Sequence, residues 1–308
     1  MKEPVLEVRG LSKTFADIHA VKDLNLTILQ GDVYGFIGPN GAGKTTTIRM
    51  ILSLIHSDSG TVRIFGHDLH RDFRKTIAQV GALVESPAFY PYLSGYRNLS
   101  LFGDLSGGVN QARVREVLEM VGLSKRAKHK VKGYSHGMKQ RLGIGLALLH
   151  SPKLLILDEP TNGLDPQGIR EVRNLIRRIS QEGKMTVFLS SHILSEMEMV
   201  CNRIGIMYRG GLIAEGDVDK LLGGEQDLAE LKTDEADRAK DFLEKNFPGI
   251  RLQIPKAGWL EFRKEQWDLS KINRDLVQAG FSVHSISARR RNLEDLFVEQ
   301  TGDSKDVY

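Results

Sequence analysis

The spacing of apolar residues changes several times along the chain, and each change marks a new structural element. Alternating apolar and polar residues predict half-buried strands, whereas short continuous apolar runs predict strands that are buried on both faces. The first pattern predicts strands at 4–9 and 24–29, and the second predicts strands at 32–38, 153–160 and 184–192. The last two runs end in polar residues, as the buried parallel strands of an α/β protein do.

Apolar residues with helical spacing follow the strand at 32–38 and also occupy a long central stretch of the chain. Apolar residues recur three or four positions apart in 44–55, and the pattern is mostly helical between 99 and 150. Residues 203–217 predict a hairpin that turns at Gly210 and Gly211. Together these elements predict one large α/β domain.

The composition shifts at LLGGEQD, residues 221–227, which predicts a domain boundary near residue 222. We therefore expect a large domain at 1–222 and a smaller one at 223–308. The smaller domain is predicted to contain a strand, a helix, two strands, a helix, a strand and a helix, at 228–231, 235–246, 250–254, 259–263, 269–278, 281–287 and 292–300. That order is typical of a ferredoxin-like α+β domain, built as a split βαβ unit.

Composition and charge indicate an ordinary globular protein. The 308 residues are 41% hydrophobic and 27% charged, and the formal net charge of +4 permits an anionic partner without requiring one. The single cysteine, Cys201, excludes an internal disulfide and is expected to be a small core residue. No apolar run approaches a length of about 20 residues, which a membrane span needs, and the N-terminus lacks the apolar stretch of a signal peptide. We therefore expect a cytosolic protein.

The stretch GPNGAGKTT matches the phosphate-binding pattern G-x-x-x-x-G-K-[ST] where a predicted strand meets a predicted helix. Glycines let backbone N–H groups turn inward around phosphates, and the helix adds its positive N-terminal end. Lys44 would place a charge on the β- and γ-phosphates, and the Thr45 hydroxyl would ligate Mg²⁺. We expect this phosphate loop to hold a nucleotide through Gly38, Pro39, Asn40, Gly41, Ala42, Gly43, Lys44, Thr45 and Thr46.

Two further strand ends carry polar groups suited to phosphate chemistry. Asp158 would orient Mg²⁺ through its water shell, and Glu159 would polarise the attacking water as a general base. Such an acidic pair alone is more often a helix cap or a solvated turn, but a phosphate loop in the same chain favours catalysis. His192 ends another apolar run, from which it would reach the γ-phosphate; a structural histidine is the alternative.

The stretch GYSHGMKQRLG suggests a second phosphate grip, because Ser135 and Gly137 stand at the start of a predicted helix. The sequence contains no second phosphate loop that this grip would serve. A serine N-cap without any ligand explains the local pattern equally well. Only the complete set of motifs distinguishes the two interpretations.

The order and spacing of GPNGAGKTT, YSHGMKQR, LLILDEP, TNGLD and SSH resemble the ATPase subunit of an ABC transporter, over residues 4 to about 222. The resemblance implies an α/β P-loop NTPase fold of the ABC type, with a mixed sheet core, an antiparallel β subdomain and a helical subdomain at about 88–150. It also implies an ATPase that uses ATP and Mg²⁺. We expect a head-to-tail homodimer, although the sequence leaves open whether the two subunits are identical.

In such a dimer the phosphate loop of one subunit faces the signature turn, YSHGM, of the other. Ser135 and Gly137 would then grip the γ-phosphate of the nucleotide that the partner chain binds. The resemblance also places Asp165 near the opposite site and Phe15 where relatives stack an aromatic ring on adenine. A core position is the alternative for Phe15.

Two departures from the family pattern are informative. The signature turn has YSHGM where the usual form is LSGGQ, but the serine and the glycine two positions later are kept. Glu85 stands where the family has a glutamine that touches Mg²⁺ and the attacking water. A carboxylate is a stronger Mg²⁺ ligand but adds negative charge beside a triphosphate; a solvated turn residue is the alternative. This form resembles the bacitracin- and lantibiotic-exporting branch of bacterial ABC transporters.

Three aromatic residues, Phe89, Tyr90 and Tyr92, follow this position directly. If they are exposed, they form a patch suited to receive a cytoplasmic helix of a multi-span membrane subunit, which we expect to dock near Glu85–Tyr96. Core positions are the alternative. The C-terminal stretch NLEDLFVEQT resembles the tail of drug-exporter ATPases.

We therefore expect the cytoplasmic ATPase subunit of a bacterial exporter, peripheral on the inner face of the cell membrane. It would power the transport of a drug, an antibiotic peptide or a similar substrate through a separate membrane subunit. The alternative is a soluble ABC ATPase that acts on nucleic acid or the ribosome. Such proteins usually carry a coiled-coil insert or two cassettes, and this sequence has neither, nor a basic and aromatic run, so no nucleic acid partner is expected. A small-molecule phosphotransferase would leave the signature turn unexplained.

Overall fold

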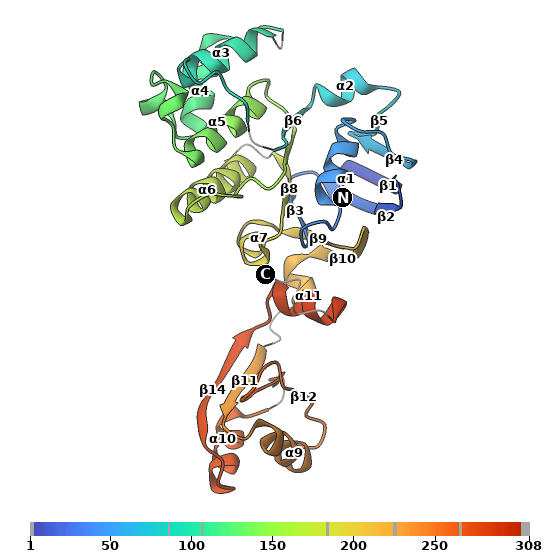
Figure 1. Ribbon diagram of the computed structural model, residues 1–308, viewed down its shortest axis with the longest axis vertical. Helices are drawn as coiled ribbons and strands as arrows, with labels where there is room; N and C mark the ends of the chain where they lie inside the picture. The colour runs from blue at the N-terminus through green and yellow to red at the C-terminus, as the bar shows by residue number, and fades with distance from the viewer. Residues whose placement is uncertain are drawn as a thin grey trace. The chain divides into compact units, whose positions relative to one another are not determined.

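A computed structural model describes residues 3–85, 87–105, 107–182, 185–223, 227–264 and 267–302 of the chain. The chain divides into two compact units: one is Asp219–Glu299, and the other contains residues 1–218 together with 300–308. Each unit has its own sheets and its own apolar core (Figure 1).

The centre of the first unit is a six-stranded sheet in the order β10-β9-β3-β8-β7-β6. Its strands are β3 (Val33–Ile37), β6 (Val80–Leu83), β7 (Leu154–Leu157), β8 (Thr186–Ser191), β9 (Arg203–Tyr208) and β10 (Gly211–Asp217). β3, β7 and β8 are buried along their whole length and pair in parallel, which confirms the predicted buried parallel strands. Because parallel strands end at the same edge of a sheet, the loops after these three strands meet there.

The second sheet of this unit is antiparallel, in the order β2-β1-β4-β5. Its strands are β1 (Pro4–Phe15), β2 (Ile18–Leu29), β4 (Ser59–Ile64) and β5 (His67–Asp68). β1 and β2 are longer than predicted, because register shifts along their hairpin interrupt the simple alternation of apolar and polar residues. Their buried side chains share one core with those of β3 and of α1 (Lys44–Ile51).

The helices α3 (Gly95–Leu105), α4 (Gln111–Met120) and α5 (His136–Leu148) lie together in the first unit (Figure 1). They confirm the predicted helical stretch between 99 and 150, whereas α1 ends before the predicted position 55. The unit also contains α2 (Phe73–Ile77), the 3₁₀ turns η1 (Ser124–Arg126) and η2 (Val131–Gly133), α6 (Pro166–Glu182), α7 (Leu194–Val200) and the start of α8 (Val218–Leu221). None of the helices in the described ranges combines the length and the apolarity that a membrane span requires.

The second unit has a four-stranded antiparallel sheet in the order β12-β13-β11-β14. Its elements are β11 (Asp227–Thr233), α9 (Ala236–Asn246), β12 (Leu252–Gln253), β13 (Trp259–Arg263), α10 (Leu269–Gln278), β14 (Val283–Arg290) and α11 (Leu293–Thr301). They follow the predicted order, but the strand expected at 250–254 keeps only two residues. Side chains from the sheet, α9 and α10 form the core. The boundary near residue 222 and the ferredoxin-like description stay predictions.

Candidate functional site

The phosphate loop connects β3 to α1, and neighbouring backbone fixes its shape. Gly43 precedes the first residue of α1 with a φ of 106°, a left-handed conformation that favours glycine. A Cβ on Gly38 would lie 2.1 Å from the carbonyl oxygen of Met207, and one on Gly43 would lie 2.3 Å from that of Ala20. Both distances are far inside van der Waals contact. The fold of this chain therefore requires glycine at both positions.

The tip of the hairpin between β9 and β10 supports the same loop. The turn lies at Arg209 and Gly210, one residue before the predicted position. The N–H of Gly210 donates to the carbonyl of Ala42 at 3.0 Å, and the carbonyl of Gly210 accepts from the N–H of Lys22 at 2.8 Å. The turn thus ties the phosphate loop to β2.

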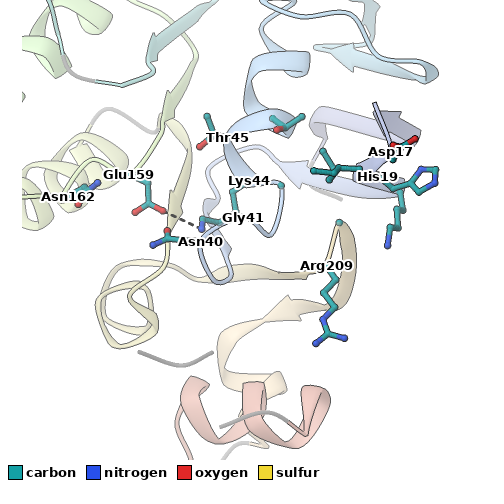
Figure 2. Close-up of a pocket in the computed structure, with 15 residues that line it drawn as sticks. Asp17, His19, Asn40, Gly41, Lys44, Thr45, Glu159, Asn162 and Arg209 are labelled. Carbon is teal, nitrogen blue, oxygen red and sulfur yellow. Dashed lines mark ion pairs between the residues drawn. The ribbon is translucent and has the colours of Figure 1, made fainter. Parts of the chain in front are cut away.

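Lys44 is the first residue of α1, and its ammonium group lies inside the phosphate loop. Nζ donates to the carbonyls of Gly38 at 2.7 Å and Pro39 at 3.1 Å. It also lies 3.3 Å from a carboxylate oxygen of Glu159, an ion pair that Figure 2 marks with a dashed line. The side chain of Lys44 is only 5% exposed. The chain therefore holds this cation at the centre of the loop.

Asp158 and Thr45 meet where β7 ends and α1 begins. Thr45 Oγ1 donates to Asp158 Oδ1 at 3.3 Å, and Ser190 Oγ donates to the same oxygen at 2.6 Å. Ser190 Oγ also accepts from the N–H of Glu159 at 2.9 Å. Ser190, near the end of β8, is not among the predicted site residues, although the polar end of its apolar run is a signal that points to it.

The pair of Thr45 and Asp158 fits a Mg²⁺ site, because a hydroxyl and a carboxylate oxygen lie side by side. Over the described ranges, no group of three or more His, Cys, Asp and Glu residues is arranged to hold a metal ion by itself. A Mg²⁺ ion here would therefore take further oxygen ligands from a bound phosphate and from water, as nucleotide enzymes commonly arrange it.

Glu159 links Lys44 to His192. Its backbone has a φ of 47°, which is uncommon for a residue other than glycine. One carboxylate oxygen faces Lys44, and the other lies 2.8 Å from Nδ1 of His192. The three residues predicted to be catalytic therefore form one connected row. Backbone conformations of this sparsely populated kind cluster at functional sites.

A pocket of about 740 Å³ opens beside these residues (Figure 2). This volume falls in the range of about 300–1,000 Å³ that is usual for ligand pockets. The phosphate loop, Glu159 and Asn162 form one part of its lining. Figure 2 shows Asp17, His19 and Arg209 on the side away from Glu159. This second group comprises Asp17, Ile18, His19, Ala20, Lys22, Arg209 and Gly210, and none of these residues is among the predicted site residues.

Phe15, the predicted adenine-stacking residue, does not line this pocket. It ends β1 with 47% of its surface exposed, and the ammonium of Lys13 lies 5.4 Å from the centroid of its ring. Ile18, at the start of β2, is 71% exposed and does line the pocket. The core alternative for Phe15 is therefore wrong, and its stacking role stays a prediction.

The residues predicted to act across the dimer also lie outside the pocket lining. Ser135 is the N-cap of α5, and its hydroxyl accepts from the N–H of Met138 at 3.2 Å. A Cβ added to Gly137 would lie 3.6 Å from the Cα of Gly168, an ordinary contact. Asp165 Oδ1 accepts from the N–H of Gly168 at 2.9 Å. Ser135 and Asp165 therefore cap the starts of α5 and α6, and neither side chain lines the nucleotide pocket of its own chain.

Glu85 follows β6 with a φ of 65° and does not line the pocket either. Its carboxylate forms an ion pair with Arg49, and its side chain is 64% exposed. Arg49 belongs to the last turn of α1. The ion pair therefore fastens Glu85 to the far end of the helix that begins at Lys44.

The aromatic loop that precedes α3 is held from within by Asn98, which is fully buried. The Asn98 side chain accepts from the N–H of Tyr90 at 2.9 Å and donates to the carbonyl of the same residue at 3.1 Å. Tyr90 and Tyr92 are 54% and 74% exposed, whereas Phe89 is partly buried. The condition for an exposed aromatic patch is met at two of the three positions.

Comparison with known proteins gives a consistent family. Residues 21–162 match the ABC transporter family. YhcH of Bacillus subtilis, an uncharacterized ABC transporter ATP-binding protein, is 40% identical over 98% of this chain and 97% of its own length. The bacitracin transport ATP-binding protein BcrA of Bacillus licheniformis is 40% identical over 97% of each chain. The lantibiotic transport ATP-binding protein SrtF of Streptococcus pyogenes is 42% identical over 74% of this chain and 95% of its own.

Solved structures agree with the fold of the first unit. An ATP-binding subunit of an ABC transporter has a TM-score of 0.61 and 31% identity over 70% of this chain and 91% of its own. The dimeric cassette MJ0796, in a post-hydrolysis state with ADP and Pi, has a TM-score of 0.61 and 25% identity over 69% of this chain and 98% of its own. The predicted ABC-type fold is confirmed. The chain belongs to the ATP-binding proteins of ABC transporters, and it is an ATPase.

Proposed function

We propose that this chain is the ATP-hydrolysing subunit of a bacterial export system, which moves a drug, an antibiotic peptide or a similar compound through a separate membrane subunit. The similarity to BcrA carries the proposal, because it extends over 97% of both chains and so includes the second unit as well as the ATPase unit. BcrA and SrtF are both transport ATP-binding proteins, which favours a transport function over an action on nucleic acid or the ribosome.

In the proposed reaction, Lys44 would bind the β- and γ-phosphates, and Glu159 would accept the proton of the attacking water. Two observations support these roles: Nζ of Lys44 lies inside the phosphate loop, and the carboxylate of Glu159 borders the same pocket. His192 would reach the γ-phosphate, and it would also keep the Glu159 carboxylate in place through its Nδ1, 2.8 Å away. Phosphate binding and water activation would therefore be carried by two different but neighbouring residues, Lys44 and Glu159.

A bound Mg²⁺ would neutralise the negative charge that develops on the phosphates. Thr45 and Asp158 would hold it, and Ser190 would orient Asp158 through their 2.6 Å hydrogen bond. Glu85 would supply a further carboxylate to the same ion, after its ion pair with Arg49 opens. Thr45 and Asp158 therefore form the main part of the proposed Mg²⁺ site.

Two identical subunits would assemble head to tail, so that Ser135 and Gly137 of one chain grip the γ-phosphate bound to the other. The open surroundings of Gly137 support this arrangement, since no contact among the described residues of its own chain requires a glycine there. Asp165 would approach the opposite site from the loop before α6. Dimerisation of the MJ0796 cassette gives a precedent for a dimer in this fold.

The membrane subunit would dock on the exposed patch of Tyr90 and Tyr92, next to Glu85. This position supports a coupling between docking and hydrolysis, because the loop that follows β6 carries both the patch and Glu85. The chain would then work in the cytoplasm, peripheral on the inner face of the cell membrane. Purification of the full chain from native membranes, with mass spectrometry of its partners, tests this: a multi-span protein is expected, whereas ribosomal proteins or nucleic acid would overturn the proposal.

A mixing experiment tests the head-to-tail dimer. We expect Lys44→Ala and Ser135→Arg each to abolish ATP-dependent dimerisation alone, because the first damages the phosphate loop and the second the grip. In a mixed dimer, one site combines both lesions and the other pairs an intact loop with an intact signature turn. Cross-linking with ATP and Mg²⁺ should then recover mixed dimers.

If Ser135 instead served the nucleotide of its own chain, every site in the mixed dimer would carry one lesion. No mixed dimer would then form, and the head-to-tail arrangement would be wrong. Circular dichroism of each variant is the control for folding, since loss of the N-cap costs only about 1 kcal/mol.

A further inference from the structure

A second pocket, of about 690 Å³, lies on the helical part of the first unit. Its walls come from the start of α3, from α4 and from the segment around η1. The pocket shares no lining residue with the nucleotide pocket. It is lined by Ser94, Tyr96, Arg97, Gln111, Arg115, Leu118, Glu119, Ser124, Ala127 and Lys128.

Backbone hydrogen bonds hold the walls of this pocket together. The N–H of Tyr96 donates to the carbonyl of Ala127 at 2.9 Å, and an isolated β-bridge joins Ser94 to Lys130. Leu118 is only 2% exposed and contributes an apolar side chain to the lining. The pocket is therefore a preformed hollow, supported by fixed elements of the fold.

The lining is positively charged and lacks internal compensation. It contains the cations Arg97, Arg115 and Lys128 but a single carboxylate, Glu119. Among the residues that the structure describes, no ion pair involves any of these three cations. Three neighbouring cations without partners repel one another and attract an anionic group.

The region around the pocket is also positively charged. Residues 88–150 contain ten Lys and Arg residues but only three Asp and Glu residues, a net charge of +7. The whole chain has a net charge of only +4, so the remainder of the sequence carries −3. The positive charge of this protein is thus concentrated on its helical part.

We propose that this pocket binds an acidic segment of a partner protein, one that presents Asp or Glu side chains, and that the segment belongs to the membrane subunit. The assignment of the partner rests on the proposed function. Ser94 and Tyr96, which line the pocket, directly follow the exposed Tyr90 and Tyr92 in the sequence. One segment would therefore cover both, with its apolar part on the tyrosines and its acidic part in the pocket. The concave shape fits a protein segment better than the flat surface of a membrane.

Fluorescence anisotropy with the full chain tests the site. The probe is a labelled helical peptide rich in Glu and Ala, and its Lys-for-Glu counterpart is the control peptide. The pocket variant combines Arg97→Gln, Arg115→Gln and Lys128→Gln. The matched control combines Lys125→Gln, Lys130→Gln and Lys132→Gln, which removes the same charge from the same region at exposed positions outside the lining.

We expect the acidic peptide to bind the wild type more weakly as salt rises, and the Lys peptide not to bind. The pocket variant should lose about tenfold in affinity, since three exposed ion pairs contribute roughly 0.2–1 kcal/mol each. The control variant should change by less than about twofold. ATP-dependent dimerisation should be the same in both variants, which separates this site from the nucleotide site.

Equal losses in both variants, or no loss in the pocket variant, would overturn the site. The site would also be overturned if the binding of phosphatidylglycerol vesicles required Arg97, Arg115 and Lys128 but the binding of the acidic peptide did not. The ligand would then be a lipid. Co-purification of the pocket variant with the membrane subunit at wild-type yield would overturn the assignment of the partner. Absence of any membrane subunit in the wild-type purification would instead contradict the proposed function.

Discussion

The phosphate loop and the signature turn are both suited to hold a phosphate, but their surroundings differ. In the phosphate loop, a Cβ on Gly38 or Gly43 would meet backbone oxygens of the same chain at 2.1 and 2.3 Å. In the signature turn, a Cβ on Gly137 would meet its nearest atom at 3.6 Å. The first two glycines are explained by the packing of their own chain, and the third is not.

This difference indicates where each glycine is needed. The phosphate loop needs glycine in order to fold, because β2 and β9 leave no room for a side chain. The signature turn has that room in the single chain, so a requirement for glycine there would arise only when another molecule approaches. A second subunit that brings its nucleotide against α5 is such a molecule, in agreement with the proposed dimer.

The largest expected effect is on ATP hydrolysis, and it comes from a change that leaves both phosphate-binding regions intact. We expect Glu159→Gln to lower the rate of ATP hydrolysis by about 10²- to 10⁴-fold, because the amide is unable to accept the proton of the attacking water. Lys44 and the signature turn are unchanged, so ATP should still bind and bring two subunits together. Size-exclusion chromatography with ATP and Mg²⁺ should show a dimer, and a strictly monomeric variant would count against the two-subunit site.

The next effect contrasts the two kinds of glycine directly. Gly43→Ala should destabilise the fold by more than about 2 kcal/mol, since the new methyl group meets the backbone of Ala20 in a left-handed conformation. Gly137→Ala should change the free energy of unfolding by less than about 1 kcal/mol, the range of a glycine-to-alanine change in a helix. Urea unfolding measures both values.

The same Gly137→Ala variant should nevertheless weaken ATP-dependent dimerisation, by about tenfold or more, if the glycine admits the phosphate of a partner. Ala147→Gly in the same helix is a control that alters helix propensity away from the turn. If Gly137→Ala dimerises like the wild type, glycine is not needed at position 137 for the approach of a second subunit.

The smallest expected effect concerns Glu85, which lies outside both phosphate grips. Glu85→Gln removes one negative charge and an exposed ion pair with Arg49, so stability should change by less than about 1 kcal/mol. ATP affinity should stay nearly constant, but the Mg²⁺ dependence and the rate of hydrolysis should shift a few-fold. If both match the wild type, Glu85 is a solvated turn residue.

The sequence by itself determined the phosphate loop and the placement of the other motifs at strand ends. Its apolar runs identify β3, β7 and β8 as buried strands, and parallel pairing brings their carboxyl ends to one edge. Lys44, Asp158 and Glu159 were therefore predictable as neighbours. Ferredoxin-like packing of the second domain also follows from the pattern, but it stays a prediction.

Only the tertiary structure decided which side chains border the pocket and which ones reach solvent. Ser190 joins Asp158 to the backbone of Glu159, and Ile18 lines the pocket where Phe15 was expected. The exposure of Tyr90 and the free space at Gly137 also emerge only in three dimensions. Local sequence patterns specify backbone conformation, because strands and helices depend on neighbouring residues. Burial and close approach depend on segments far away in the chain, such as β9 beside the phosphate loop, which no local pattern encodes.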